Sequence, residues 1–127
     1  MIIDSSAILA ILYNELDAAA FAEAISGAET CRISAVTYVE AAIVIEARNK
    51  AAGRHFDAFI QRSGITVEPV TENQALVARQ AYTDFGKGRH PAGLNFGDCF
   101  SYALAAVSGE PLLFKGNDFS KTDIRKV

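Results

Sequence analysis

Four short apolar segments, each separated from the next by helix-length stretches, constrain how this chain can fold. The segments are residues 1–4, 31–34, 66–70 and 111–114. Strands joined through helices run parallel, because a crossover connection carries the chain back to the edge where the previous strand began. The pattern therefore predicts an α/β fold with a mostly parallel central sheet covered by helices on both faces.

Capping residues and glycines set the expected helix boundaries. Ser5 or Ser6, Ser34 and Thr71 precede three of the helices as candidate N-caps, since a hydroxyl oxygen can accept a free backbone N–H. Gly53 is expected to lie just beyond the end of the third helix. The predicted helices cover residues 7–13, 17–25, 35–51, 54–62, 72–85 and 96–108.

The composition predicts one cytoplasmic domain, residues 1–127. Half of the residues are apolar and 21% are charged, with a formal net charge of -3. A polyanionic partner would therefore need a local basic patch or metal ions. Cys31 and Cys99 lie in apolar runs and are expected to be reduced core residues. No signal peptide and no run of membrane-spanning length is expected, because MIID reaches an acid by position 4.

A lone carboxylate in the most apolar helix needs an explanation. The stretch LNFGDCFSYALAAV (94–107) carries a single charge, Asp98. Left uncompensated, a buried charge costs several kcal/mol. Asp98 can be the third residue of a helix capped by Asn95, an arrangement worth about 1 kcal/mol or less. A metal ion is the other explanation.

Three further acids are expected at the same edge of the sheet as Asp98. Asp4 ends the first strand, Asp118 follows the last, and Glu40 lies early in the helix after the second. In parallel sheets, ligands bind outside the carboxyl ends of the strands. Each acid also has an ordinary explanation: a strand-end acid, a turn residue, or a buried salt bridge. Because those explanations require four coincidences on one edge, we favour a shared function.

Glu40 is the most informative of the four acids. At 100° per residue it falls within the arc of Val36, Val39, Ile43 and Ala47, which predicts a carboxylate on the buried stripe of its helix. Such a group needs a cation or a hydrogen-bond partner. Oxygen-only ligands favour Mg²⁺ or Mn²⁺ over zinc, and the two histidines have no metal-ligand spacing. Ions of this kind act mostly on phosphate oxygens, where they can activate a water molecule.

Four motifs together resemble the PIN-domain ribonucleases, and more narrowly the VapC toxins. They are MIIDSSAILAIL, SAVTYVEAAIV, LNFGDCFSYALA and LLFKGNDFSKTDI. The resemblance implies a three-layer α/β/α fold. It also implies a type II toxin–antitoxin component that cleaves RNA endonucleolytically, using Mg²⁺ or Mn²⁺ and a metal-activated water.

The resemblance also implies roles for individual residues. Asp4, Glu40, Asp98 and Asp118 match the four catalytic and metal-binding acids, with Asp4 and Asp98 contacting the ion directly. Ser6 matches a supporting hydroxyl.

Other positions are less tightly defined. Asn117 matches a polar neighbour of the fourth acid, and Asp123 is an alternative for that acid. Residues 86–95 form a predicted glycine-rich loop, in which Lys87, Arg89 and His90 are candidate phosphate contacts; a plain solvated loop is the alternative.

Partners follow partly from the resemblance. It implies an RNA substrate such as tRNA or rRNA and a small antitoxin. Because the predicted pocket is acidic, we expect the antitoxin to place a basic side chain near the four acids. The early helices carry surplus apolar surface, which predicts a homodimer or an antitoxin contact there, with a better-packed monomer core as the alternative. The residues are Ile8, Leu9, Ile11, Leu12, Leu16, Phe21 and Ile25. Two alternatives are a non-catalytic PIN-like scaffold that binds RNA or protein and an Asp/Mg²⁺ phosphotransfer domain. The phosphotransfer domain fits poorly, because Ser6 stands where a D-x-D motif needs its second aspartate.

Overall fold

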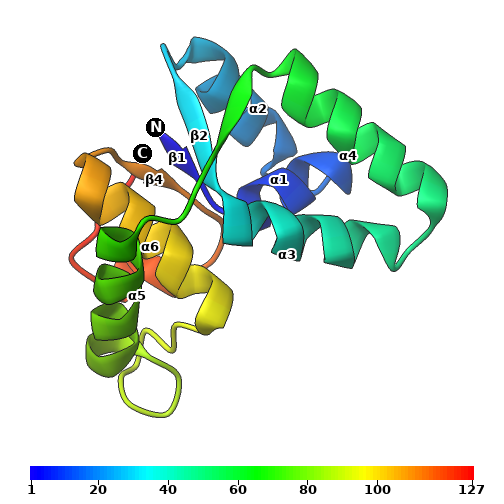
Figure 1. Cartoon of the computed structure of the whole chain (residues 1–127). Coiled ribbons are helices and arrows are strands. Elements are labelled where there is room, and N and C mark those ends of the chain that lie inside the picture. The colour runs from blue at the N-terminus through cyan, green and yellow to red at the C-terminus, as the bar shows by residue number, and fades with distance from the viewer.

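Four parallel strands form the centre of the molecule (Figure 1). The computed structural model describes all 127 residues. The strand order is β3-β2-β1-β4, and every neighbouring pair is parallel, as predicted. The strands are β1 (Ile2–Ile3), β2 (Cys31–Ser34), β3 (Ile65–Glu68) and β4 (Leu112–Leu113).

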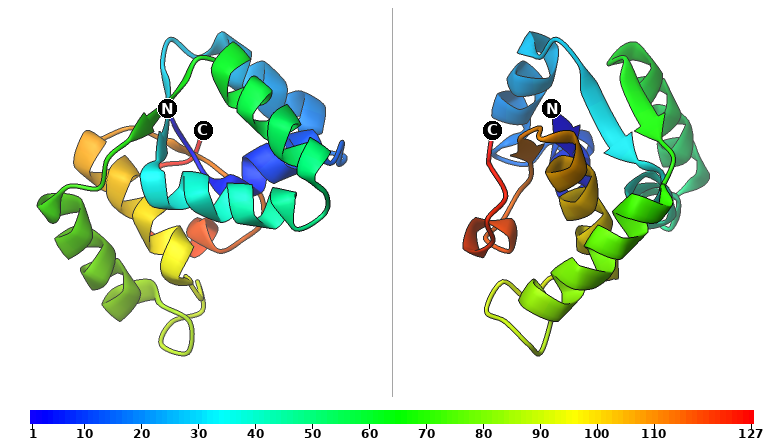
Figure 2. Two further views of the ribbon diagram at one scale, coloured as in Figure 1. Left: turned by 45° about the vertical axis from the view of Figure 1, so that its right-hand side comes forward. Right: turned by 60° about the vertical axis from the view of Figure 1, so that its left-hand side comes forward.

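Helices cover both faces of this sheet, which confirms the three-layer α/β/α architecture (Figure 2). They are α1 (Ser5–Leu12), α2 (Ala18–Gly27), α3 (Ala35–Glu46), α4 (Lys50–Arg62), α5 (Glu72–Phe85) and α6 (Phe96–Ser108), followed by the short 3-10 helix η1 (Phe119–Lys121). The first four helices pack on one face and the last two on the other. None of them has the length and apolar character that crossing a membrane requires.

The central strand β1 divides the interior into two cores. Ile2 packs with α5 and α6, whereas Ile3 packs with α1 to α4, because successive strand side chains point to opposite faces. Both side chains are fully buried. Directly after Ile3, β1 ends at Asp4, so the first acid stands at the carboxyl edge of the sheet.

The predicted helix 35–51 is wrong in its length. In the structure α3 ends at Glu46 and α4 begins at Lys50, with the Asn49 side chain accepting a hydrogen bond from the Ala52 N–H at 2.7 Å. Gly53 therefore lies inside α4 rather than beyond a helix end. A Cβ there would lie 3.0 Å from Cγ of Glu46, so this glycine allows the two helices to approach. The N-cap at Asn49 was the signal that the sequence pattern missed.

The N-cap of α1 also differs from the prediction. Asp4 caps the helix in place of Ser5 or Ser6, and its Oδ2 accepts the Ser6 N–H at 3.0 Å. Aspartate caps as well as serine does, and here it comes first in the chain. The first candidate metal ligand is thus also the residue that starts a helix. Elsewhere, Thr71 caps α5 as expected, and α5 and α6 begin and end at the predicted residues.

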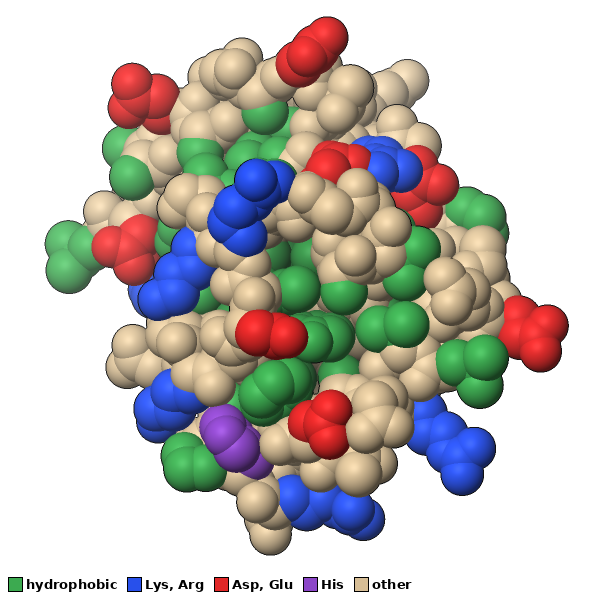
Figure 3. Space-filling view, turned by 90° about the vertical axis from the view of Figure 1, so that its left-hand side faces the viewer, with side chains coloured by type: hydrophobic (Ala, Val, Ile, Leu, Met, Phe, Trp, Pro, Cys, Tyr) green, Lys and Arg blue, Asp and Glu red, His purple; other side chains and the backbone are tan.

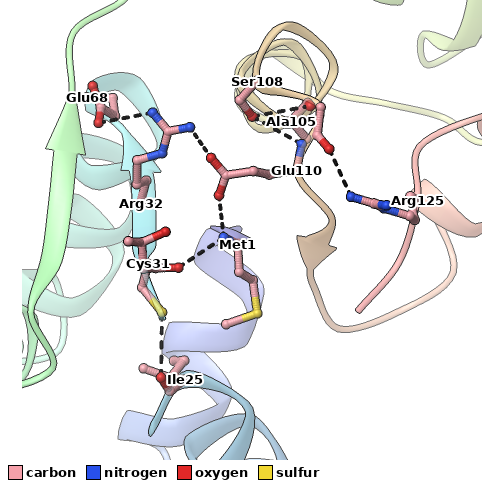
Figure 4. Close-up of polar contacts among 11 residues, drawn as sticks. Met1, Ile25, Cys31, Arg32, Glu68, Ala105, Ser108, Glu110 and Arg125 are labelled. Atoms are coloured by element: carbon pink, nitrogen blue, oxygen red, sulfur yellow. Dashed lines mark hydrogen bonds and ion pairs between the residues drawn. The ribbon is translucent and has the colours of Figure 1, made fainter. Parts of the chain in front are cut away.

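An ion-pair network begins at the amino ends of β1 and β4 and extends across β2 to the last residue of β3 (Figure 4). Glu110 accepts hydrogen bonds from the N-terminal ammonium of Met1 and from Arg32, and Arg32 also contacts Glu68 at 3.4 Å. Burial acts to raise the pKa of Glu110, but these two hydrogen bonds and the positive charges of Met1 and Arg32 together hold that pKa below its usual value. The charges of this network are therefore neutralised within the chain.

Candidate active site

Asp4 is buried and held by three hydrogen bonds at the carboxyl end of β1. Its side chain is 3% exposed. Oδ2 accepts the backbone N–H and the hydroxyl of Ser6, at 3.0 and 2.7 Å. Oδ1 accepts the Ser101 hydroxyl of α6 at 2.7 Å. Ser6 Oγ in turn accepts the Lys115 N–H at 3.0 Å, which ties the start of α1 to the loop after β4.

Asp98 has the capping geometry that the sequence suggested, but capping does not account for all of its surroundings. Asn95 Oδ1 accepts the Asp98 N–H, and Asp98 Oδ2 accepts the Asn95 N–H, both at 2.9 Å. The residue is only 9% exposed. Burial raises the pKa of Asp98 to about 7 against the lowering effect of the Asn95 N–H, and the negative charges of three other acids, Asp4, Asp118 and Glu40, raise it further.

Glu40 extends from α3 to the start of α6. Its Oε1 accepts the Ser5 hydroxyl at 2.8 Å. Its Oε2 lies against the backbone of Gly97, where a Cβ would come within 1.8 Å of that oxygen. Glu40 therefore reaches the residue next to Asp98 only because position 97 has no side chain.

The predicted buried stripe on the Glu40 helix is wrong. Val39 and Ile43 are 51% and 63% exposed. The apolar residues of α3 are distributed around most of the helix, so helical periodicity does not identify which face is buried. Glu40 instead lines an exposed apolar groove between α3 and the start of α6. The buried residues of α3 are Thr37, Ala41 and Ile45.

Of the two candidates for the fourth acid, Asp118 rather than Asp123 acts electrostatically on Asp98. Asp118 is exposed at the start of η1, yet its charge acts on Asp98. Asp123 accepts the Tyr102 hydroxyl at 2.7 Å and is not among the charges that shift Asp98. Asn117 is exposed beside Asp118, and its carbonyl accepts the Ser120 N–H at 3.1 Å.

The predicted basic loop is not joined to the acids by any hydrogen bond or ion pair. Lys87 and Arg89 are exposed, and Arg89 lies over the Tyr82 ring at 5.5 Å. His90 Nδ1 accepts the Ala92 N–H at 3.0 Å, which is a contact within the loop itself. A role of these three residues in phosphate binding stays a prediction.

The donor set fits a hard divalent cation. All four acids offer oxygen ligands, and none of them forms an ion pair with a Lys, an Arg or the N-terminus. As the side chains stand, no three acids converge tightly enough to enclose an ion. Binding through more than two of them would require rotation, which the exposed Asp118 can provide most easily.

Hydroxyl groups complete the site, and sequence reasoning missed three of them. Ser5 donates to Glu40, Ser101 donates to Asp4, and Thr37 contacts Ser101. The signal available in the sequence was spacing: Ser101 follows Asp98 by three positions and Thr37 precedes Glu40 by three. Residues three apart share one helix face.

Comparison with known proteins identifies the family of this chain. The PIN domain family matches residues 1–125. Ribonuclease VapC28 of Mycobacterium tuberculosis is 54% identical over 128 residues, covering 99% of this chain and 96% of that protein.

Two solved structures share the fold at low identity. Mycobacterium tuberculosis VapC20, described as a toxin that cleaves the sarcin–ricin loop, matches with a TM-score of 0.79 at 20% identity, over 99% of this chain and 97% of that one. A toxin–antitoxin complex from Klebsiella pneumoniae matches with a TM-score of 0.73 at 14% identity, over 96% and 92%. The chain therefore belongs to the PIN-domain family, and within that family to the VapC ribonucleases.

Proposed function

We propose that this protein is the endoribonuclease toxin of a type II toxin–antitoxin pair and that it hydrolyses RNA phosphodiesters with Mg²⁺ or Mn²⁺. The observation that carries the proposal is a cluster of four acids with no basic partner, centred on the buried Asp4 and Asp98. Membership of the VapC ribonucleases supports RNA as the substrate class. Structured RNA, such as tRNA or rRNA, is the proposed target.

Each acid has a proposed part in holding the ion. Asp4 and Asp98 would bind it directly, because they are the two buried carboxylates of the cluster. Glu40 and Asp118 would complete the site, directly or through water. A bound Mg²⁺ supplies a Lewis acid that lowers the pKa of a water molecule and stabilises the leaving oxygen of a phosphodiester. The chain's own contribution is to fix these oxygens on rigid elements.

The test is cleavage of a mixture of labelled cellular tRNA and rRNA by the purified chain. We expect cleavage with Mg²⁺ or Mn²⁺, none in excess EDTA, and a loss of several orders of magnitude in Asp98→Asn. Asp123→Asn is the matched control, since it removes a nearby charge but keeps an acceptor for Tyr102. RNA binding without cleavage by the wild-type chain would instead favour the scaffold alternative.

An antitoxin partner is proposed on charge as well as family membership. The unpaired carboxylates offer an inserted arginine two or more acceptors, and an arginine there would exclude the metal. Coexpression with the neighbouring gene product should yield a complex with suppressed cleavage. If the chain forms no such complex and its expression alone does not slow cell growth, the toxin assignment is contradicted even if the chain cleaves RNA.

The surplus apolar surface predicted on the early helices is not there. Ile8 and Ile25 are buried, and Leu16 alone is fully exposed. The partly buried residues Leu9, Ile11, Leu12 and Phe21 pack against the protein's own core. Other surfaces are more apolar: Figure 3 shows hydrophobic side chains gathered along the middle of the face that carries α5, α6 and the C-terminal segment.

We propose that the homodimer contact lies on α3, because the exposed apolar side chains of this helix line a continuous groove. Val39, Ile43 and Val44 of α3 and Phe96 of α6 are all exposed, and they line the groove that contains Glu40. Light scattering should give a dimer mass for the wild type and a monomer mass for Ile43→Asp. Leu16→Asp, an equally drastic change at an exposed leucine, should remain dimeric. A monomeric wild type would contradict the contact.

A further inference from the structure

We propose that Ser101 and Thr37 are positioning residues that set the orientation of Asp4 for cation binding, an inference that rests on the proposed function. Thr37 lies on α3 and Ser101 on α6, and both side chains are fully buried where these two helices meet beyond the carboxyl ends of the strands. Their hydroxyl oxygens are 2.9 Å apart. Ser101 continues the contact to Asp4 Oδ1 at 2.7 Å.

The direction of this chain of hydrogen bonds follows from counting protons. An ionised carboxylate only accepts, so the single hydroxyl proton of Ser101 is used on Asp4. Thr37 must then be the donor to Ser101. The order is therefore Thr37 to Ser101 to Asp4, and each bond polarises the next toward the carboxylate.

Counting lone pairs shows why Ser101 matters for the ion. A carboxylate has about four acceptor sites, two on each oxygen. On Asp4, Oδ2 accepts two hydrogen bonds from Ser6, and Oδ1 accepts one from Ser101. The one acceptor site left for a cation is on Oδ1, the oxygen that Ser101 holds. The Ser101 hydroxyl therefore sets the direction in which that site points.

The burial of Thr37 and Ser101 makes the hydrogen-bonded chain that holds Asp4 rigid. Thr37 is β-branched and restricted in χ1, and neither hydroxyl has access to solvent that could replace a lost partner. The Thr37–Ser101 contact also connects the helix that carries Glu40 to the helix that carries Asp98. A shift of either helix would be transmitted to Asp4 through these two hydroxyls.

The experiment measures Mn²⁺ affinity by titration calorimetry on the full chain, together with kcat and KM for RNA cleavage. We expect Ser101→Ala to fold, to bind Mn²⁺ about ten- to a hundredfold more weakly, and to lose kcat with little change in KM. Ser101→Thr restores the hydroxyl and should recover most of the affinity. Ser108→Ala is the matched control, because it also removes a hydroxyl from α6. The Ser108 hydroxyl contacts only backbone groups, the carbonyl of Ala105 and the N–H of Glu110, and none of the four candidate metal ligands.

These measurements distinguish a positioning role of Ser101 from a purely structural role. Wild-type Mn²⁺ affinity and kcat in a folded Ser101→Ala would overturn the inference, leaving Ser101 a purely structural residue. If Ser101→Ala does not fold, Thr37→Val decides, since it keeps the shape and the Ser101–Asp4 bond but removes the donor. It should weaken Mn²⁺ binding severalfold, and unchanged binding overturns the inference. A wild-type chain that neither binds Mn²⁺ nor cleaves RNA refutes the proposed function itself.

Discussion

Replacing Gly97 with alanine should move Glu40 out of the site without unfolding the protein. An alanine Cβ at this position would lie 1.8 Å from Glu40 Oε2 and 2.6 Å from Cδ. Carbon and oxygen atoms in contact need more than 3 Å, so the carboxylate must move. Gly97 does not have a positive φ, and the backbone therefore accepts alanine without strain.

The expected stability change is small because two effects oppose each other. Moving Glu40 breaks its hydrogen bond with Ser5, which is worth about 1 kcal/mol. Alanine is favoured over glycine in a helix by up to about 1 kcal/mol. The free energy of unfolding of Gly97→Ala should therefore lie within about 1 kcal/mol of the wild type. RNA cleavage, in contrast, should fall at least about tenfold if Glu40 helps hold the ion.

A double-mutant cycle separates this effect from general damage to α6. In a Glu40→Ala background the clash is absent, so Gly97→Ala should cause no further loss of cleavage and should stabilise the helix. Urea unfolding and initial cleavage rates on the four variants provide the measurement. Full activity of Gly97→Ala would refute a role of Glu40 in the site, and additive losses in the double variant would refute the placement of Glu40 against Gly97.

Two further predictions concern the metal-free and metal-bound states. The pKa of Asp98 is raised from 3.8 to about 7, so between these values the folded chain binds more protons than the unfolded one. In EDTA, stability should therefore fall as pH rises through this window, by at most about 4 kcal/mol in total, and level off above it. Urea titrations should show the slope in the wild type and not in Asp98→Asn. Secondly, Mg²⁺ or Mn²⁺ should raise the melting temperature, since an ion that binds only the folded state stabilises it. Glu40→Gln should reduce this gain, and an unchanged gain would remove Glu40 from the metal site.

The layer architecture was predictable because the chain repeats one simple alternation. Each strand is followed by one or two helices, and parallel connections then leave few topologies. The boundary between α3 and α4 was not predictable from periodicity. Residues 46–52 (EARNKAA) are almost all helix formers, and Gly53 suggests a helix end although it serves as a contact point for Glu46. Whether Gly53 ends a helix or allows two helices to pack closely depends on which residue lies opposite it in the fold.

Glu40 shows that a correct location can follow from an incorrect premise. The helical wheel placed it on a buried stripe, whereas Val39 and Ile43 of that stripe face solvent. The carboxylate is at the site because Ser5 and the open backbone at Gly97 receive it. Neither of these can be recognised before the helices are packed together.

Acids and hydroxyls differ in how visible they are in a single sequence, for a physical reason. A carboxylate in an apolar stretch is costly to bury, so the sequence LNFGDCFSYALAAV alone indicates that Asp98 needs a partner. A serine is much less costly to bury and is tolerated at most positions, so the sequence does not indicate that Ser101 in the same stretch has a role. Yet the structure places its hydroxyl 2.7 Å from Asp4, which lies 97 positions earlier in the chain. Charge identifies which residues could do chemistry, whereas the neutral groups that orient them are found only once the fold shows which oxygens they contact.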